Sequence, residues 1–180
     1  MHRLSEDTIK KLNRVKNVIS NREKLRNKGI LEEKWIEAYL HADCFKGIPF
    51  EDLKKMFDAC DKETLKKISQ KECGHPYGDA HNSLQPFTIF RGCVGEAFRP
   101  GMSWTTCLSQ AIKYPKRSKW HNFYGDDANQ RCSVWVALVE KDEIYCYIGH
   151  NEPEFIVCPQ NYWKIDLPQE YFIYNIPDEI

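Results

Sequence analysis

The fold is decided by four runs of sequence in the C-terminal part of the chain: FTIFRG (87–92), GMSWTT (101–106), CSVWVALV (132–139) and NEPEFIV (151–157). Strand-forming β-branched and aromatic residues recur in them, and such residues favour extended backbone. The run CSVWVALV is apolar on both faces, which predicts a central strand rather than an edge strand. On these grounds we expect strands at residues 87–91, 102–106, 132–139, 143–148, 154–158 and 171–176.

Three stretches next to these strands predict other structure. A helix is expected from Cys107 to Tyr114, where Pro115 ends it because proline has no N–H to donate. Residues 115–131 then form a long polar and aromatic loop, of the kind that often covers a functional site. The stretch 73–86 is rich in Gly, Pro, Asn and Asp and predicts a loop before the first strand.

The first seventy residues predict helices. Ser5 caps a helix that has acidic residues in its first turn and an apolar stripe along its length, and Gly29 ends it. Further helices are expected at 31–40 and 50–59, and a short one follows from Asp61. No single stripe can bury itself, so these helices must pack on one another or on the strands.

Together these elements predict an α+β fold, with a helical N-terminal segment (1–72) packed on a mostly antiparallel sheet within residues 73–180. The chain has 180 residues, of which 42% are hydrophobic and 29% charged, and this suits a globular domain with a real core. The two parts are expected to form one compact unit, because about 95 strand-bearing residues make a thin core on their own.

The sequence favours a protein that stays in the cytoplasm. No run of apolar residues reaches the roughly eighteen that a membrane-spanning helix needs, so no membrane partner is expected. The opening MHRLSEDTIKK also lacks the apolar core of a secretory signal.

Eight cysteines are spread evenly along the chain without a C-x-x-C pair. In a reducing compartment we expect free thiols, most of them buried as small apolar side chains. Cys73, His75 and His81 lie close together in sequence and offer the alternative of a metal site. A single cysteine without paired spacing favours no metal.

The net charge is zero, but residues 1–30 hold nine Lys and Arg residues against three acids. Such a basic arm attracts nucleic acid, an anionic membrane or an acidic partner. The solvated face of a helix gives the same pattern and is the commoner reason for it. The sequence leaves both interpretations open.

A cation, a hydroxyl and two carboxylates lie at the ends of the expected strands. Arg91 ends one strand, Ser103 opens the next, and Glu152 and Glu154 lie where a later strand begins. Arginine clamps phosphate, and a carboxylate stabilises an oxocarbenium-like centre, so these groups suit an enzyme that splits a charged dinucleotide. The structural alternatives are a salt bridge from Arg91 to the C-terminal acids and a solvated acidic turn at the glutamates.

In this order, the stretch 87–158 resembles the arginine–serine–glutamate (R-S-E) class of mono-ADP-ribosyltransferases, which use NAD as donor and include small bacterial and phage effectors and toxins. The resemblance implies a split β-sheet core and no metal. It implies that the catalytic residues are Glu154, Glu152, Ser103 and Arg91. The residues that it implies for NAD binding are Arg91, Gly92, Ser103, Trp104, Thr105, Tyr114 and Glu154.

The resemblance also implies a role for each site residue. Glu154 bonds the nicotinamide ribose, Glu152 orients or deprotonates the acceptor, and Ser103 buttresses Glu154. Arg91 clamps the pyrophosphate or ribose, and Gly92 lets the backbone approach the nicotinamide amide. Trp104 is the weakest of the set, because a tryptophan there more often packs in a core. The family usually places an aromatic residue beside the nicotinamide, for which the candidates are Phe98, Tyr114, Phe123 and Tyr124.

The resemblance implies NAD-dependent transfer of ADP-ribose to a macromolecule, either an arginine of a protein or a nucleic acid. Toxin–antitoxin relatives imply a neutralising antitoxin as a further partner. Only eleven residues separate Arg91 from Ser103, so helices that intervene in larger members must come from elsewhere, and residues 1–72 can supply them. Two other classes remain: a catalytically silent binding protein of the same fold, and a nucleic-acid-binding protein that uses the basic N-terminal helices.

Overall fold

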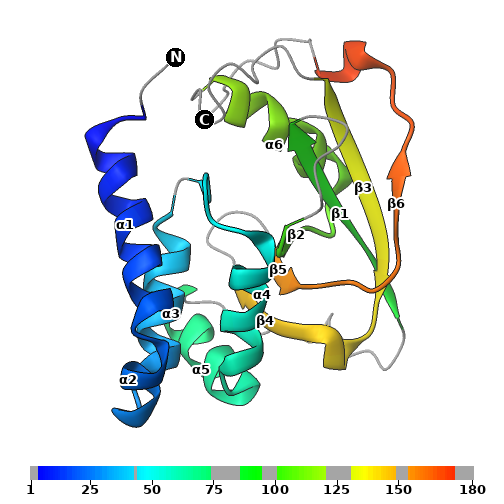
Figure 1. Ribbon diagram of the computed structural model, residues 1–180. Helices are drawn as coiled ribbons and strands as arrows, with labels where there is room; N and C mark the ends of the chain where they lie inside the picture. The colour runs from blue at the N-terminus through cyan, green and yellow to red at the C-terminus, as the bar shows by residue number, and fades with distance from the viewer. Residues whose placement is uncertain are drawn as a thin grey trace.

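The computed structural model of the chain describes residues 4–42, 44–73, 86–94, 101–120, 131–148 and 154–172 (Figure 1). Side chains are described throughout these ranges except at 70–73 and 116–120. The fold is α+β, with an N-terminal helical region and two small antiparallel sheets. The N-terminal helices are α1 (Glu6–Ser20), α2 (Arg22–Asn27), α3 (Leu31–Leu40), α4 (Phe50–Ala59) and α5 (Lys62–Cys73).

The first predicted helix is two helices. Ser5 caps α1 as expected, because its hydroxyl oxygen accepts a hydrogen bond from the Thr8 N–H at 3.1 Å. The helix stops at Ser20, and the Asn21 side chain donates back to the Asn17 carbonyl at 2.9 Å. A second helix, α2, then follows and ends before Gly29, whose φ is +68°.

The other helices follow the sequence closely. α3 and α4 have the predicted bounds, and α5 begins where Asp61 caps it, with the Thr64 N–H donating to Asp61 Oδ1 at 2.8 Å. α5 runs to Cys73 and is therefore longer than the short helix expected there.

The strands form two sheets of three strands each. One sheet has the order β1-β3-β6, from β1 (Phe87–Val94), β3 (Cys132–Val139) and β6 (Tyr162–Ile165). The other has the order β2-β5-β4, from β2 (Ser103–Trp104), β5 (Glu154–Val157) and β4 (Ile144–Ile148). All pairings are antiparallel, and β3 is central, as its two apolar faces predicted. Backbone hydrogen bonds between Phe90 and Thr105, at 2.7 and 2.8 Å, join the sheets.

The C-terminal end of the chain differs from the expectation in two places. No strand was expected at Tyr162–Ile165, where the structure has β6. The strand expected at 171–176 is wrong at residues 171 and 172, which belong to the 3-10 helix η4 (Gln169–Phe172), and residues 173–176 lie outside the described part. A second 3-10 helix, η3 (Lys141–Glu143), precedes β4.

The prediction that Pro115 ends a helix is also wrong. The helix α6 runs from Leu108 to Trp120 with Pro115 inside it. Pro115 cannot donate to the carbonyl of Ala111, and this carbonyl faces Gly92 of β1 instead. A Cβ at Gly92 would stand 1.8 Å from the Ala111 oxygen and 2.5 Å from Pro115 Cδ, so only glycine admits the helix here.

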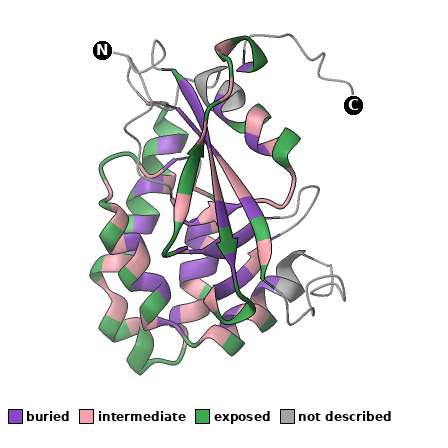
Figure 2. Cartoon of the chain, turned by 90° about the vertical axis from the view of Figure 1, so that its right-hand side faces the viewer, coloured by how far each residue is buried: buried purple, intermediate pink, exposed green. Residues whose placement is uncertain are grey.

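Three apolar cores order the elements as four layers: the N-terminal helices, the β2-β5-β4 sheet, the β1-β3-β6 sheet and α6. In Figure 1 the N-terminal helices lie on the left and the β1-β3-β6 sheet on the right, with β4 and β5 between them. Residues of β5 alternate between two cores: Ile156 faces the helices, whereas Phe155 and Val157 face the other sheet. Figure 2 shows the buried positions of the helices turned inward and the exposed ones turned outward.

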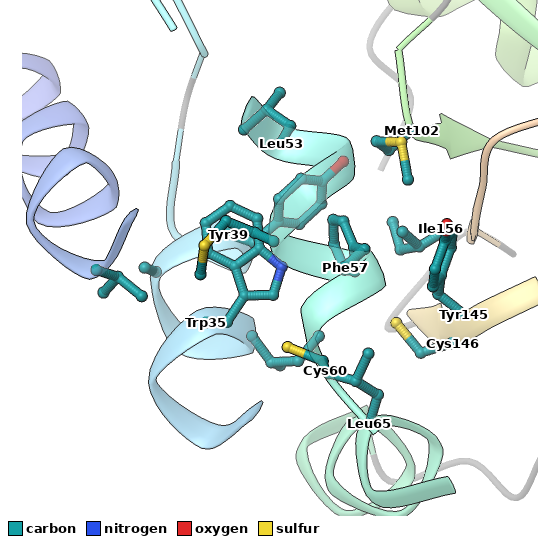
Figure 3. Close-up of a cluster of buried hydrophobic side chains, with 14 of the residues drawn as sticks. Trp35, Tyr39, Leu53, Phe57, Cys60, Leu65, Met102, Tyr145, Cys146 and Ile156 are labelled. Carbon is teal, nitrogen blue, oxygen red and sulfur yellow. The ribbon is translucent and has the colours of Figure 1, made fainter. Parts of the chain in front are cut away.

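The helical core and the strands share one apolar cluster. Trp35 and Phe57 from the helices pack with Tyr145, Cys146 and Ile156 from β4 and β5 (Figure 3). A bond from the Tyr145 hydroxyl to the Asp58 carboxylate ties β4 to α4 within this contact. The helical segment therefore covers the face of the β2-β5-β4 sheet that lies opposite the β1-β3-β6 sheet.

The expectation of free thiols is confirmed for the seven cysteines whose side chains are described. Cys44, Cys60, Cys93, Cys132 and Cys146 are buried, and Cys107 and Cys158 are partly buried. Across the described ranges, we find no helix that is both long and apolar enough to cross a lipid bilayer.

Candidate functional site

Three of the expected site residues lie in strands beside the junction of the two sheets. Ser103 opens β2 and Glu154 opens β5, as expected. The expectation that Arg91 ends a strand is wrong, because β1 continues through Gly92 to Val94 in register with β3. Ser103 pairs directly with Ile156, so their side chains share a face of the sheet. Glu154 is two residues before Ile156 on extended backbone and shares that face. Ser103 and Glu154 are thus both turned toward the N-terminal helices.

The Arg91 guanidinium is held against β2. Its Nη1 donates a hydrogen bond to the Ser103 carbonyl oxygen at 2.5 Å. Gly101 makes room for it, because a Cβ on this residue would stand only 2.7 Å from Arg91 Nη2 and 3.0 Å from Cζ. The alternative salt bridge from Arg91 to the C-terminal acids stays untested at Asp178 and Glu179, which lie outside the described part.

A residue from the helical segment completes the site, and sequence reasoning missed it. The Tyr39 hydroxyl of α3 lies 2.8 Å from Ser103 Oγ, across 64 residues of chain. Its side chain is buried, with 6% of the residue exposed. In the sequence Tyr39 stands among the apolar residues of the helix expected at 31–40, which hides its role. The available signal was that a buried tyrosine hydroxyl usually needs a polar partner.

Charges from two strands act on the buried Tyr39 hydroxyl. Burial raises the pKa of the Tyr39 hydroxyl far above its usual value, and the Glu154 carboxylate raises it further. The hydrogen bond with Ser103 and the Arg91 guanidinium act in the opposite direction. Glu154 and Arg91 therefore both lie within electrostatic reach of the same hydroxyl, from different strands.

Gly92 offers backbone groups to the junction of the sheets. Phe90 turns its N–H and C=O away from β3 to bond Thr105. Gly92 lies two residues further on, so its N–H and C=O point to the same edge, on the side of Ser103. The packing of α6 by itself requires that this residue has no Cβ, and the approach of a ligand to Gly92 stays a prediction.

The remaining expected cofactor residues differ in their surroundings. The Trp104 side chain is buried between the two sheets, and its Nε1 donates to the Gly101 carbonyl at 2.9 Å, so it belongs to the core. Thr105 Oγ1 accepts from the Cys107 N–H at 3.0 Å and shapes the entry to α6. Tyr114 of α6 is 46% exposed and also affects the pKa of Tyr39, so it lies near the site.

Several expected site residues lie outside the described residues: Glu152, Phe98, Phe123 and Tyr124, together with His75 and His81 of the alternative metal site. Cys73 lies at the end of α5 with its side chain undescribed. Within the described ranges, no three His, Cys, Asp or Glu side chains come close enough to hold a metal ion.

Two cavities of the described region lie elsewhere. One of about 220 Å³ lies between β3, β6 and η4, and one of about 200 Å³ lies beside Gly101, Trp104 and α4. Neither is lined by Arg91, Ser103 or Glu154. Both are smaller than typical ligand sites of about 300–1,000 Å³, so the converging side chains, rather than a cavity, define the candidate site.

No protein-family model matches the chain, and neither a curated protein nor a solved structure matches it. The interpretation of the site therefore depends on its own side chains and backbone groups.

Proposed function

We propose that this protein is an NAD-dependent mono-ADP-ribosyltransferase, which cleaves the nicotinamide–ribose bond of NAD and transfers ADP-ribose to a macromolecule. The observation that carries the proposal is the convergence of Arg91, Ser103 and Glu154 at the junction of two sheets. These residues come from three different strands and span 63 positions of sequence, yet Ser103 contacts the Tyr39 hydroxyl and the charges of Arg91 and Glu154 both act on its pKa.

The chemistry of these groups suits that reaction. Loss of nicotinamide leaves positive charge on the ribose, and the Glu154 carboxylate would stabilise that charge as it develops. An arginine guanidinium presents a planar fork of N–H donors, which matches phosphate oxygens well, so Arg91 suits the pyrophosphate of NAD. The N–H and C=O of Gly92 are suited to a carboxamide, which needs one donor and one acceptor.

The arrangement of the sheets supports the same proposal. Among the described residues, the two antiparallel sheets are joined by the backbone pair of Phe90 and Thr105, and this arrangement is compatible with the split core that the resemblance implies. Beyond this pair β1 and β2 are no longer bonded to each other among the described residues, which leaves room for Arg91 to reach Ser103 from the neighbouring strand.

The alternative of a nucleic-acid-binding protein has weaker support. Lys11, Arg14 and Arg22 of the basic arm form ion pairs within the molecule, at N–O distances of 2.8, 3.4 and 3.0 Å. Pairs of this exposed kind are common on solvated helices and contribute little energy. They favour the interpretation of the arm as a solvated helix face.

The proposal is tested by incubating the protein with NAD labelled in the adenylate part, together with separate pools of protein, RNA and DNA. Release of nicotinamide and labelling of one pool are the expected results, and the labelled pool identifies the acceptor class. If no pool is labelled and no nicotinamide is released, the catalytically silent alternative is favoured.

Gly101→Ala tests whether the position of the Arg91 guanidinium matters for NAD. The new methyl group would lie 2.7 Å from Arg91 Nη2 and would push the guanidinium off Ser103. We expect KM for NAD to rise about tenfold, the effect of losing one charge-assisted hydrogen bond, with little change in stability. Steady-state nicotinamide release and thermal unfolding measure the two effects, and an unchanged KM would show that the position of Arg91 does not matter for NAD.

A further inference from the structure

We propose that Tyr39 is a positioning residue of this site, holding the Ser103 hydroxyl in the orientation in which Ser103 supports Glu154. The inference rests on the function proposed above. It makes the N-terminal helical segment part of the reaction centre, because α3 supplies the residue that fixes a strand hydroxyl.

The Tyr39 ring is held on three sides by aromatic neighbours. Phe45 stacks on it at 4.9 Å between ring centroids, Phe57 meets it edge-on at 5.0 Å, and Trp35 lies at 5.8 Å. Figure 3 shows the ring among these helices with its hydroxyl directed toward Met102, the residue before Ser103. A tyrosine ring has few rotatable bonds, so this packing fixes the position of the hydroxyl closely.

Apolar packing alone does not explain why residue 39 carries a hydroxyl. A phenylalanine would fill the same apolar space, and a buried hydroxyl costs free energy unless it is hydrogen-bonded. Its partner, at 2.8 Å, is the Ser103 side chain, which shares a face of the sheet with Glu154. The helical core therefore touches the site through a polar contact at this point.

The direction of the hydrogen bond follows from acidity. A phenol is a better donor than an aliphatic hydroxyl, so Tyr39 donates and Ser103 Oγ accepts. The Ser103 proton is then left to donate elsewhere, and Glu154 is the anion on that face. Since burial keeps the pKa of Tyr39 well above its usual value, the hydroxyl stays protonated and neutral, and it cannot serve as a general base near neutral pH.

Tyr145 provides a matched control. Like Tyr39, Tyr145 is 6% exposed and packs on Phe57, with 5.5 Å between the ring centroids. Its hydroxyl donates a hydrogen bond to the Asp58 carboxylate. Its bond ties β4 to α4 and lies away from Ser103. Tyr145→Phe therefore removes a comparable structural hydrogen bond from the same cluster without touching the site.

The test compares Tyr39→Phe with Tyr145→Phe. We expect Tyr39→Phe to lower kcat for nicotinamide release about tenfold with little change in KM, while Tyr145→Phe lowers Tm and leaves kcat unchanged. Combined with Ser103→Ala, the Tyr39→Phe change should lower kcat no further, because it acts through Ser103. A wild-type kcat in Tyr39→Phe, or losses that multiply in the double variant, would overturn the inference.

A second readout separates this inference from the proposed function. Titration of the Glu154 carboxyl by NMR should give a pKa about one pH unit higher in Tyr39→Phe than in the wild type. The reason is that the Ser103 hydroxyl, no longer held by Tyr39, donates less often to the Glu154 carboxylate. Tyr145→Phe should leave that pKa in place. A protein that shows this shift but no NAD cleavage contradicts the enzyme and retains the positioning role, whereas no shift contradicts the positioning role.

Discussion

Glu154→Gln is expected to lower the rate of nicotinamide release from NAD at least about 100-fold, because glutamine keeps the shape of the side chain but removes its negative charge. That charge lies within reach of the Tyr39 hydroxyl and stands at the opening of a strand whose next residues, Phe155 and Ile156, are fully buried. The carboxylate is thus carried by a rigid element. The measurement is kcat with saturating NAD, alongside Tm to show that the variant folds.

Two further substitutions make that result specific. Glu170→Gln changes an exposed glutamate of η4 and should leave the rate unchanged. Glu152→Ala should retain NAD hydrolysis but lose transfer to the acceptor, if its role is to orient or deprotonate the acceptor. Near-normal turnover in Glu154→Gln would remove this residue from the reaction.

Gly92→Ala is expected to destabilise the fold by about 3 kcal/mol, at the upper end of what overpacking costs. Its methyl group would stand 1.8 Å from the Ala111 carbonyl oxygen and 2.5 Å from Pro115 Cδ, both in α6. The Ala111 oxygen belongs to backbone, so α6 as a whole would have to move off β1. Urea unfolding of the wild type and of Gly92→Ala measures the difference in their free energies of unfolding.

Gly101→Ala is the matched control for this stability effect. Its methyl group would meet the end of the flexible Arg91 side chain rather than backbone, so its cost in free energy should stay below about 1 kcal/mol. Equal losses in the two alanine variants would mean that α6 can shift freely and that Gly92 is not required by its packing.

Local sequence signals predicted most of the fold. The bounds of α3 and α4 agree with the predicted ranges, since apolar spacing and the flanking Gly and Pro residues define them. The central place of β3 followed from its two apolar faces. These elements carry their signal within a few neighbouring residues.

The elements that were predicted wrongly depend on distant residues. Pro115 stays inside α6 because Gly92, more than twenty positions earlier, lets the freed Ala111 carbonyl lie close to β1. β6 pairs with β3 despite its exposed Trp163 and Lys164, and only the register of that pairing reveals it as a strand. Residue propensities within a short window of sequence reveal neither the close approach of α6 to Gly92 nor the pairing of β6 with β3.

The site was predicted in part for the same reason. Arg91, Ser103 and Glu154 could be found because each lies next to a recognisable strand, and their order along the chain suggested one site. Tyr39 could not be found in this way, because its position among Trp35, Ile36 and Leu40 looks like any apolar helix stripe. Its contact with Ser103 exists only once α3 packs against β2 and β5.

The most direct test of the central claim is a crystal structure of Glu154→Gln with NAD bound. We predict that the nicotinamide carboxamide will bond the N–H and C=O of Gly92, with the Arg91 guanidinium on the pyrophosphate or ribose and residue 154 beside the nicotinamide ribose. NAD bound away from the junction of the two sheets, or an empty junction at millimolar NAD, would contradict the account.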